Sequence, residues 1–314
     1  MSNGSLEFLE PRLCNIIVSS YEGELDESDN YSGKGELKTA DGSSYDGFFL
    51  NGVFHGKGSY RWVNDVTYVG DFQEGTITGT GTYTWPDGST YSGEVRSGKR
   101  HGKGVFKCSA GQLYDGEWYD GYRHGNGTAS YEEGRSTTVY SGEWYMGKRQ
   151  GYGKMQYASG NHYEGYWYGD KKCGKGVMKW INDQSTYAGE WDNDLPNGNG
   201  ETLWANLKMS RLVTKQMSSV YRGAMKDGRK EGNGSFIYAD GAQYSGEWDK
   251  DVKHGEGVVL LGNGDMESTK FECGKRMNEP LKPVISSPAI SGKKKDAAKK
   301  TVKGESPSHV SATG

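Results

Sequence analysis

Small and apolar residues alternate with polar ones along most of the chain, and the alternation restarts at regular intervals. Each restart begins with Tyr-x-Gly, and an aromatic or apolar residue follows two positions later, as in Tyr114, Gly116 and Trp118. A period of two is typical of a β-strand with one face turned to a core. Most of the ten copies are 23 or 24 residues apart, and they begin at Tyr21, Tyr45, Tyr68, Tyr91, Tyr114, Tyr140, Tyr163, Tyr187, Tyr221 and Tyr244.

Each copy contains a second alternating segment, separated from the first by a turn pair. Asp120-Gly121 is such a pair, and it favours a tight hairpin turn with positive φ. From Tyr45 onward, a Gly-x-Gly begins eleven residues after every tyrosine of the series, from Gly56 to Gly255. We therefore predict one β-hairpin per copy, because so many glycines disfavour helix.

A single hairpin is not stable in water, so the copies must stack. Stacking in sequence order predicts an all-β fold: an elongated, single-layer antiparallel meander of about ten hairpins, with about twenty strands and roughly 95 Å long at ~4.8 Å per strand. The predicted sheet covers residues 21–275. It includes a half-copy around Phe271 and Gly274, and it is interrupted by an insert at 205–220.

The turn length sets the pairing within a hairpin. With a two-residue turn, Tyr114 lies opposite Gly127, the second glycine of its Gly-x-Gly, and Trp118 lies opposite Arg123. A ring over a cross-strand glycine covers backbone, and a cation over an indole adds roughly 0.5–1 kcal/mol. A bulged three-residue turn would shift this pairing by one residue, and the sequence leaves both alternatives open.

The predicted sheet has one aromatic face and one acidic face, which we interpret as solvated. A single layer has no second layer to bury the aromatic rows, and Trp and Tyr are enriched in interface hot spots. We therefore predict that the aromatic face is an exposed groove for a partner protein. Its candidate binding residues are Trp118, Trp144, Trp167, Trp191, Trp248, Tyr114, Tyr140 and Tyr163.

Composition supports a repeated β-architecture over an ordinary packed core. The 314 residues include 50 Gly, 22 Tyr and 9 Trp, and only 33% are hydrophobic. No run approaches the ~18 apolar residues of a membrane-spanning helix, and we expect no secretory signal. The four cysteines are scattered without a CxxC pair, which favours a reducing intracellular compartment.

Motifs that resemble ligand sites have simpler structural interpretations. Residues 93–99 and 142–148 begin like a phosphate-binding loop, but Arg follows each where Ser or Thr is needed, and each segment spans a hairpin. A metal site needs converging ligands, so we interpret the histidines opposite the acidic row as structural partners of carboxylates. These histidines are His55, His101, His124 and His254. We predict no catalytic residue, no cofactor and no metal, and hence a protein that is not an enzyme.

Three segments depart from the repeat. Residues 1–20 predict an arm or short strand that caps the first hairpin. The insert at 205–220 has a short helix-like apolar spacing, so a solvated loop and a docking helix are equally favoured. Residues 276–314 predict a basic, disordered tail, since 281–314 hold seven Lys against two acidic residues. A solvated tail is the simplest interpretation, although its charge suits acidic proteins, nucleic acid or anionic lipid.

The repeat units resemble a known family. YSGEVRSGKRHGKG (91–104) and YSGEWDKDVKHGEG (244–257) look like MORN repeats. IIVSSYEGE (16–24) and YASGNHYEGYW (157–167) are similar to the repeats of the radial spoke head 10 homologue B proteins of motile cilia. This resemblance implies a spoke-head component, located in the cytoplasm, the cytoskeleton and the axoneme of a cilium or flagellum, with other radial spoke head proteins as partners.

Three functions are open on these grounds. The favoured one is a non-catalytic axonemal scaffold that binds proteins through its aromatic face, with a homodimer through the repeat sheet as a further possibility and without nucleic acid. The second is a membrane- or phosphoinositide-associated scaffold, which the net acidic repeats disfavour and the basic tail supports. The third is the substrate-docking part of an enzyme, as in lipid kinases with such repeats, which would need a catalytic domain on another chain.

Overall fold

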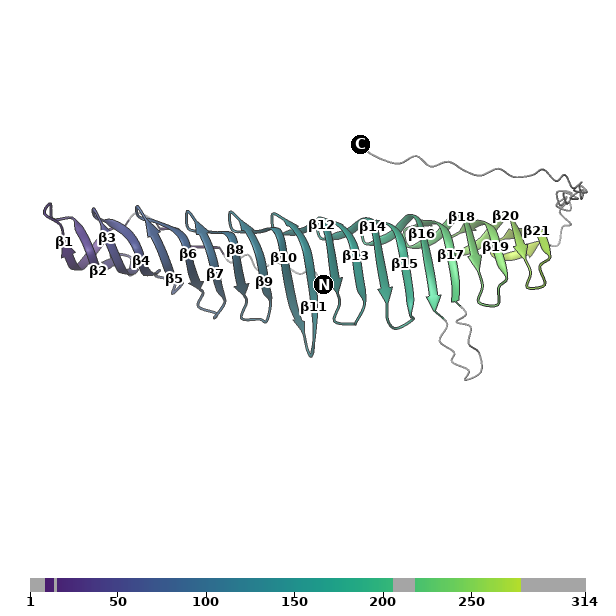
Figure 1. Ribbon diagram of the computed structural model, residues 1–314, viewed down its shortest axis with the longest axis horizontal. Helices are drawn as coiled ribbons and strands as arrows, with labels where there is room; N and C mark the ends of the chain where they lie inside the picture. Colours follow the sequence, from purple (N-terminus) through teal and green to yellow (C-terminus); the bar gives the residue numbers. More distant parts are fainter. Residues whose placement is uncertain (1–8, 14–15, 206–217, 278–314) are drawn as a thin grey trace, which may run out of the picture.

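The computed structural model describes residues 9–13, 16–205 and 218–277, and the fold is one elongated antiparallel sheet (Figure 1). Every strand pairs with its neighbours in sequence, so the chain runs back and forth from one end of the sheet to the other. No helix occurs among the described residues. The predicted all-β, single-layer meander is therefore confirmed, whereas most of the predicted tail, 278–314, and the centre of the insert, 206–217, lie outside the described residues.

The described residues form 22 strands. Their bounds are β1 (Val18–Leu25), β2 (Tyr31–Thr39), β3 (Ser44–Leu50), β4 (Val53–Arg61), β5 (Thr67–Gln73), β6 (Thr76–Thr84), β7 (Thr90–Arg96), β8 (Lys99–Lys107), β9 (Leu113–Tyr119), β10 (Tyr122–Glu133), β11 (Ser136–Tyr145), β12 (Lys148–Gln156), β13 (His162–Tyr168), β14 (Lys171–Trp180), β15 (Ser185–Asp192), β16 (Leu195–Ala205), β17 (Ser218–Lys226), β18 (Arg229–Ile237), β19 (Gln243–Asp249), β20 (Val252–Leu260), β21 (Met266–Glu272) and β22 (Lys275–Met277).

The irregular copies at the two ends of the repeat also form hairpins. Tyr21 lies in β1, which pairs with β2, and its ring covers Gly23 and Gly35 as the later tyrosines cover theirs. At the other end, Phe271 in β21 and the turn at Gly274 form the last hairpin with β22. The spacing of aromatic and glycine residues thus identifies both terminal units correctly.

The pairing within a hairpin is correct near the turn and wrong farther from it. Trp118 pairs with Arg123 as predicted, but a bulge between His124 and Gly127 places Gly127 opposite Gly116 instead of Tyr114. Gly125 has a φ of +56° in this bulge, a conformation that favours glycine. The bulge shifts the pairing by two residues, so side chains beyond it keep their faces.

The Tyr114 ring still covers Gly127, for a different reason from the predicted one. The ring leans along the strand over both Gly116 and Gly127, and a Cβ atom on Gly127 would overlap it. Its hydroxyl donates a hydrogen bond of 2.9 Å to the carbonyl oxygen of Glu117. The glycines are therefore required by a close approach of ring and backbone.

The core is a continuous stack of rings on one face of the sheet. The Trp144 ring contacts Tyr140 of its own hairpin at 5.2 Å and Tyr114 of the preceding one at 5.4 Å, both edge to face. Trp167 repeats this arrangement with Tyr163 at 5.1 Å and Tyr140 at 5.5 Å. Each tryptophan thus joins two hairpins, and stability depends on neighbours along the whole sheet.

Candidate functional site

All eight candidate binding residues lie on the aromatic face, but they are buried. Trp118, Trp144, Trp167, Trp191 and Trp248 expose between 3% and 6% of their surface, and Tyr114, Tyr140 and Tyr163 expose at most 3%. The prediction that a single layer leaves these rings exposed is wrong. Accessible binding groups must be sought elsewhere on the same face.

Three kinds of neighbour bury each tryptophan. The rings of two tyrosines flank it, its Nε1 donates to a carbonyl of the preceding hairpin, and a cation covers its outer surface. For Trp144, the acceptor is the carbonyl oxygen of Gly127 at 3.1 Å, and the Arg123 guanidinium carbon lies 4.3 Å from the ring centroid. The sequence predicts that Arg123 covers Trp118, its cross-strand partner, whereas Arg100 covers that ring at 4.5 Å. The cation thus bridges to the next hairpin.

A second aromatic row lies farther along the strands of the same face, close to the turns that connect one hairpin to the next. We call it the rim row, and it consists of Trp62, Trp85, Tyr131, Tyr157, Trp180, Trp204 and Tyr238. Trp62 and Trp85 are only 6% exposed, but the other members are partly exposed. Sequence reasoning missed this row, although its signal was present as an aromatic residue just before the second turn pair of most copies.

The N-terminal segment explains why the first members of the rim row are buried. Residues 9–13, which we call the arm, lie against the aromatic face, where Leu13 packs on the core. Trp62 Nε1 donates to the carbonyl oxygen of Arg12 at 3.2 Å. Farther along, the Ala40 amide donates to the Ile17 carbonyl oxygen at 2.8 Å. Residues 9–13 therefore lie on later hairpins, whereas the sequence predicts an arm or short strand that caps the first hairpin.

The strongest polar contact of the arm is an ion pair between Glu10 and Arg100. Both side chains are almost fully buried, with 7% and 6% exposure. Glu10 Oε1 accepts hydrogen bonds from the backbone amide and from Nε of Arg100. A buried carboxylate and guanidinium require each other, because either one alone would be a costly uncompensated charge.

The acidic face differs from its prediction in one respect. The acids three residues after the tyrosines hold the bulges: Glu117 Oε1 accepts from the Asn126 amide at 3.0 Å, and Glu94 Oε1 from the Lys103 amide at 2.9 Å. Among the described residues no histidine forms an ion pair, so the predicted histidine–carboxylate pairs are wrong. The His124 ring packs instead near Tyr119 at 5.5 Å and Tyr145 at 5.3 Å.

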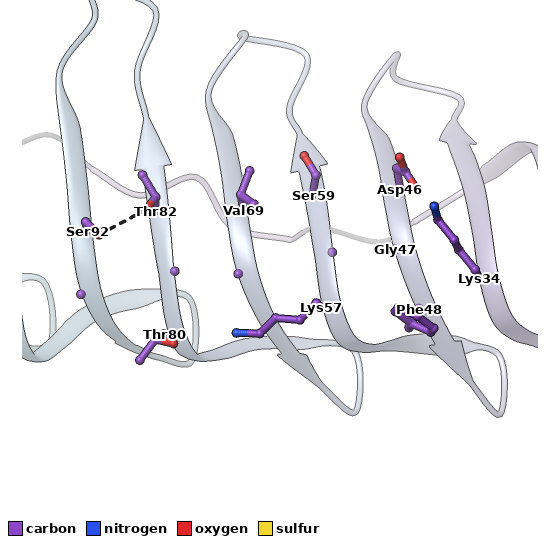
Figure 2. Close-up of a pocket in the computed structure, with 14 residues that line it drawn as sticks. Lys34, Asp46, Gly47, Phe48, Lys57, Ser59, Val69, Thr80, Thr82 and Ser92 are labelled. Atoms are coloured by element: carbon purple, nitrogen blue, oxygen red, sulfur yellow. Dashed lines mark hydrogen bonds between the residues drawn. The ribbon is translucent and has the colours of Figure 1, made fainter.

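A shallow hollow also lies on the acidic face, over β2 to β7. Its wall includes Lys34, Phe48, Lys57 and Val69, and Figure 2 shows these side chains spread over several strands rather than converging. Lys57 is already paired with Asp71 at 2.6 Å, just beside the hollow. The arrangement offers no set of groups aimed at one ligand atom.

No three His, Cys, Asp or Glu side chains in the described part of the chain are placed to hold a metal ion. Burial raises the pKa of Tyr187, Tyr221 and Tyr244 to about 12, which keeps these phenols neutral in the core. Burial also lowers the pKa of Lys172, and nearby Asp194 opposes that effect.

The strands of this sheet are its sole regular secondary structure in the described ranges. None of the described residues forms a helix that is long and apolar enough to cross a membrane.

Comparison with known proteins identifies the repeat class. The MORN repeat profile matches nine segments, 45–67, 68–90, 91–112, 114–134, 140–162, 163–185, 187–208, 221–243 and 244–266. MORN repeat-containing protein 3 of Xenopus laevis is 38% identical over 78 residues, 23% of this chain and 29% of that protein. Human alsin is 29% identical over 99 residues, 32% of this chain and 6% of alsin. The chain therefore spans less than a third of these relatives.

Solved structures give a weaker likeness. The Drosophila melanogaster SAS-4 TCP domain, solved with a proline-rich motif of Ana2, is 16% identical, with a TM-score of 0.32 over 64% of this chain and 96% of that one. That score is too low to support an argument about function. The nine repeat matches cover well over half of the chain, and with the hairpin spacing they show that it belongs to the MORN-repeat family.

Proposed function

We propose that the protein is a non-catalytic scaffold that holds partner proteins along its rigid, elongated sheet. The observation that carries this proposal is the difference between the two sets of aromatic residues on the aromatic face. The Trp and Tyr rows are buried and stabilise the sheet, whereas the rim row from Tyr131 to Tyr238 is partly exposed and runs beside them along the sheet. A line of partly exposed rings with cations nearby is chemistry that protein interfaces favour.

The proposed location is the axoneme of motile cilia, as a component of the radial spoke head. The support is the similarity of 16–24 and 157–167 to the spoke-head group named above. An axonemal linker must transmit force without deforming, and a sheet in which each tryptophan joins two hairpins suits that task. The proposed partners are other radial spoke head proteins, and a second copy of this chain is an alternative occupant.

A second candidate function is a scaffold at junctions between membrane and cytoskeleton. The seven lysines within 281–314 favour it, because basic segments bind anionic lipid surfaces. The remainder of the chain is net acidic and would be repelled by such a surface. Flotation of the full chain with anionic vesicles tests this candidate, and removal of 281–314 should abolish any flotation.

The test of the first candidate is crosslinking mass spectrometry on isolated cilia from cells that express the full chain. We expect crosslinks to spoke-head proteins after the membrane and soluble matrix have been extracted. Loss of the protein with the detergent-soluble membrane fraction would favour the second candidate. Complete exclusion from cilia would overturn the proposed location.

A further inference from the structure

Each hairpin from β7 onward places a basic side chain or a proline at one position of its second strand, and the next turn lies against it. In backbone terms these sites are alike: the amides of Gly121, Gly147 and Asp170 donate to the carbonyl oxygens of Arg100, Arg123 and Arg149 at 2.9, 2.9 and 3.1 Å. The residue at this turn position therefore determines whether a carboxylate of the same sheet lies beside the Arg or Lys side chain.

Three of these cations receive a carboxylate from their own sheet. Arg149 donates to Asp170 Oδ1 through its amide at 3.0 Å and through Nε at 2.9 Å. The amides of Lys172 and Lys230 donate in the same way to Asp194 at 2.9 Å and Asp251 at 3.0 Å. An aspartate in the turn, with φ near +70° at all three places, thus fills a defined carboxylate position.

At Arg100 the turn residue is Gly121, and the carboxylate comes from the arm. Glu10 Oε1 accepts from the amide and from Nε of Arg100, the same two atoms that Asp170 engages on Arg149. A Cβ atom on Gly121 would lie 3.4 Å from Glu10 Oε2. The arm therefore supplies the carboxylate at Arg100, whereas an aspartate in the turn supplies it in later hairpins.

Arg123 has a glycine in the turn, and no hydrogen bond or ion pair joins it to residues 9–13 of the arm. Its Nη2 donates to the Gly147 carbonyl oxygen at 2.9 Å, as Arg149 Nη2 does to Asp170 at 3.0 Å. No carboxylate contacts Arg123 within 9–13, 16–205 and 218–277. Beside it Tyr131, which accepts from its Nη1 at 3.4 Å, is a partly exposed member of the rim row.

The arm shows which chemistry fits such a position. It is an extended segment with the sequence Leu-Glu-Pro-Arg-Leu, in which the glutamate meets a guanidinium, a backbone carbonyl meets a rim indole and a leucine packs on the core. A guanidinium binds a carboxylate through two fixed donors, so Arg123 is better suited than Lys253, which also has a glycine, Gly274, in its turn.

We propose that Arg123 and the rim tyrosines Tyr131 and Tyr157 form a docking site for an extended peptide of a partner protein. The peptide carries a glutamate or aspartate flanked by apolar or prolyl residues, as the arm does. This site rests on the proposed scaffold function and names the partner chemistry that it would recognise. Charge complementarity and the example of the seated arm carry the assignment.

The test measures binding of a labelled peptide EFLEPRL, the sequence of residues 7–13, to the full chain by fluorescence anisotropy. We expect saturable binding that weakens about tenfold or more when the peptide's second glutamate is replaced by glutamine, because a charge-assisted hydrogen bond is lost. Arg123→Gln in the protein should weaken binding to a similar extent. Arg149→Gln is the matched control and should leave binding unchanged, because Asp170 already occupies its carboxylate position.

Two further variants keep the test independent of folding defects. Gly147→Asp places an aspartate where Asp170 stands relative to Arg149, so it should keep the fold and block the peptide. Asp170→Gly should do the reverse and create an additional peptide site at Arg149. Equal binding by wild type, Gly147→Asp and Arg123→Gln would overturn the proposal, because the peptide would then be exchanging with the arm at Arg100.

A second copy is the alternative occupant. If the wild-type chain dimerises in light scattering and Glu10→Gln makes it monomeric, the docked peptide is the arm of another copy, which overturns the assignment to a partner protein. Peptide binding is measured without cilia, so its failure contradicts the docking site alone, whereas exclusion from the axoneme contradicts the proposed location alone.

Discussion

The two halves of the sheet bury the same core but differ in what covers it. In the first half, around β4 to β8, the arm lies on the aromatic face, and Trp62 and Trp85 of the rim row are 6% exposed. In the second half the rim row is partly exposed, yet Trp144 and Trp167 are as buried as Phe72, their counterpart in the first half, at 3% each. The core is therefore complete within the hairpins, and the arm is an added ligand.

The halves also differ in which carboxylate pairs with their arginine side chains. Arg100 depends on Glu10, about ninety residues away in sequence, whereas Arg149 depends on Asp170 in the adjacent turn. A contact within neighbouring hairpins forms whenever the sheet forms. A contact with a terminal segment can open while the sheet stays folded, so we expect the arm to open before the sheet unfolds.

The largest expected effect is unfolding by alkali, which should affect both halves, because burial raises the pKa of tyrosines in each of them. Burial raises the pKa of Tyr187, Tyr221 and Tyr244 to about 12, above the ordinary value of 10.0. The folded state therefore favours the neutral phenol, so this stabilisation is complete below pH 10 and is lost as pH rises from 10 towards 12. The circular dichroism signal of the sheet should be lost together with the tyrosinate absorbance of the buried rings, and formation of tyrosinate at all 22 tyrosines with an intact sheet would contradict it.

The next largest effect is expected for Trp144→Ala combined with Trp167→Ala. Removing a buried tryptophan costs roughly 3–5 kcal/mol, and each of these also joins two hairpins. We expect cooperative loss of the second half in denaturant unfolding, together with any binding. Tyr168→Ala is a control, since that ring is 70% exposed, and should change the free energy of unfolding by less than about 0.5 kcal/mol. A stable double variant would show that the rings are not the core.

A glycine substitution should destabilise the two halves equally. A valine at Gly127 overlaps the Tyr114 ring, and a valine at Gly81 overlaps the Tyr68 ring. Each should lower the free energy of unfolding by about 3 kcal/mol, since overpacking costs 1–3 kcal/mol and the backbone leaves little room. Asn126→Val, exposed on the other face next to Gly127, is the control and should have little effect. A much smaller loss for Gly81→Val would mean that the packing of ring on glycine is looser in the first half than in the second.

Local periodicity was sufficient to predict the hairpins, their order and their faces. The Tyr-x-Gly and Gly-x-Gly offsets determine which side chains share a face, and both terminal half-regular units followed from the same rule. The bulge at Gly125 was not predictable from spacing, because a two-residue shift keeps every face unchanged. The pattern therefore gave the correct glycine under Tyr114 with the wrong cross-strand partner.

The binding surface was harder to predict because it depends on tertiary burial. Counting layers suggested exposed tryptophans, but rings packed edge to face, capped by Arg123 or Arg149, bury Trp144 and Trp167 within one layer. The pairing of Glu10 with Arg100 joins segments far apart in sequence, and no local pattern encodes it. The sequence shows Gly in some of these turns and Asp in others, but only the observed contacts reveal that the Asp residues bind the neighbouring Arg or Lys.

The smallest effect is expected for Asp170→Asn. Its side chain is 44% exposed, and partly exposed ion pairs contribute less than ~1 kcal/mol. The free energy of unfolding should therefore change by less than about 1 kcal/mol, with the hydrogen bond from the Arg149 amide retained by the asparagine oxygen. Urea titration checks this value, and a loss of several kcal/mol would mean that the turn aspartates hold the second half together.

Hydrogen exchange of the full-length Glu10→Gln variant tests most directly whether the arm is a ligand on a self-sufficient core. The account predicts faster exchange at the Arg100 amide, whose acceptor is Glu10, with unchanged protection at the Arg149 amide and in the core strands of both halves. A general loss of protection across β4 to β8 would contradict the account, because the arm would then be part of the core of the first half.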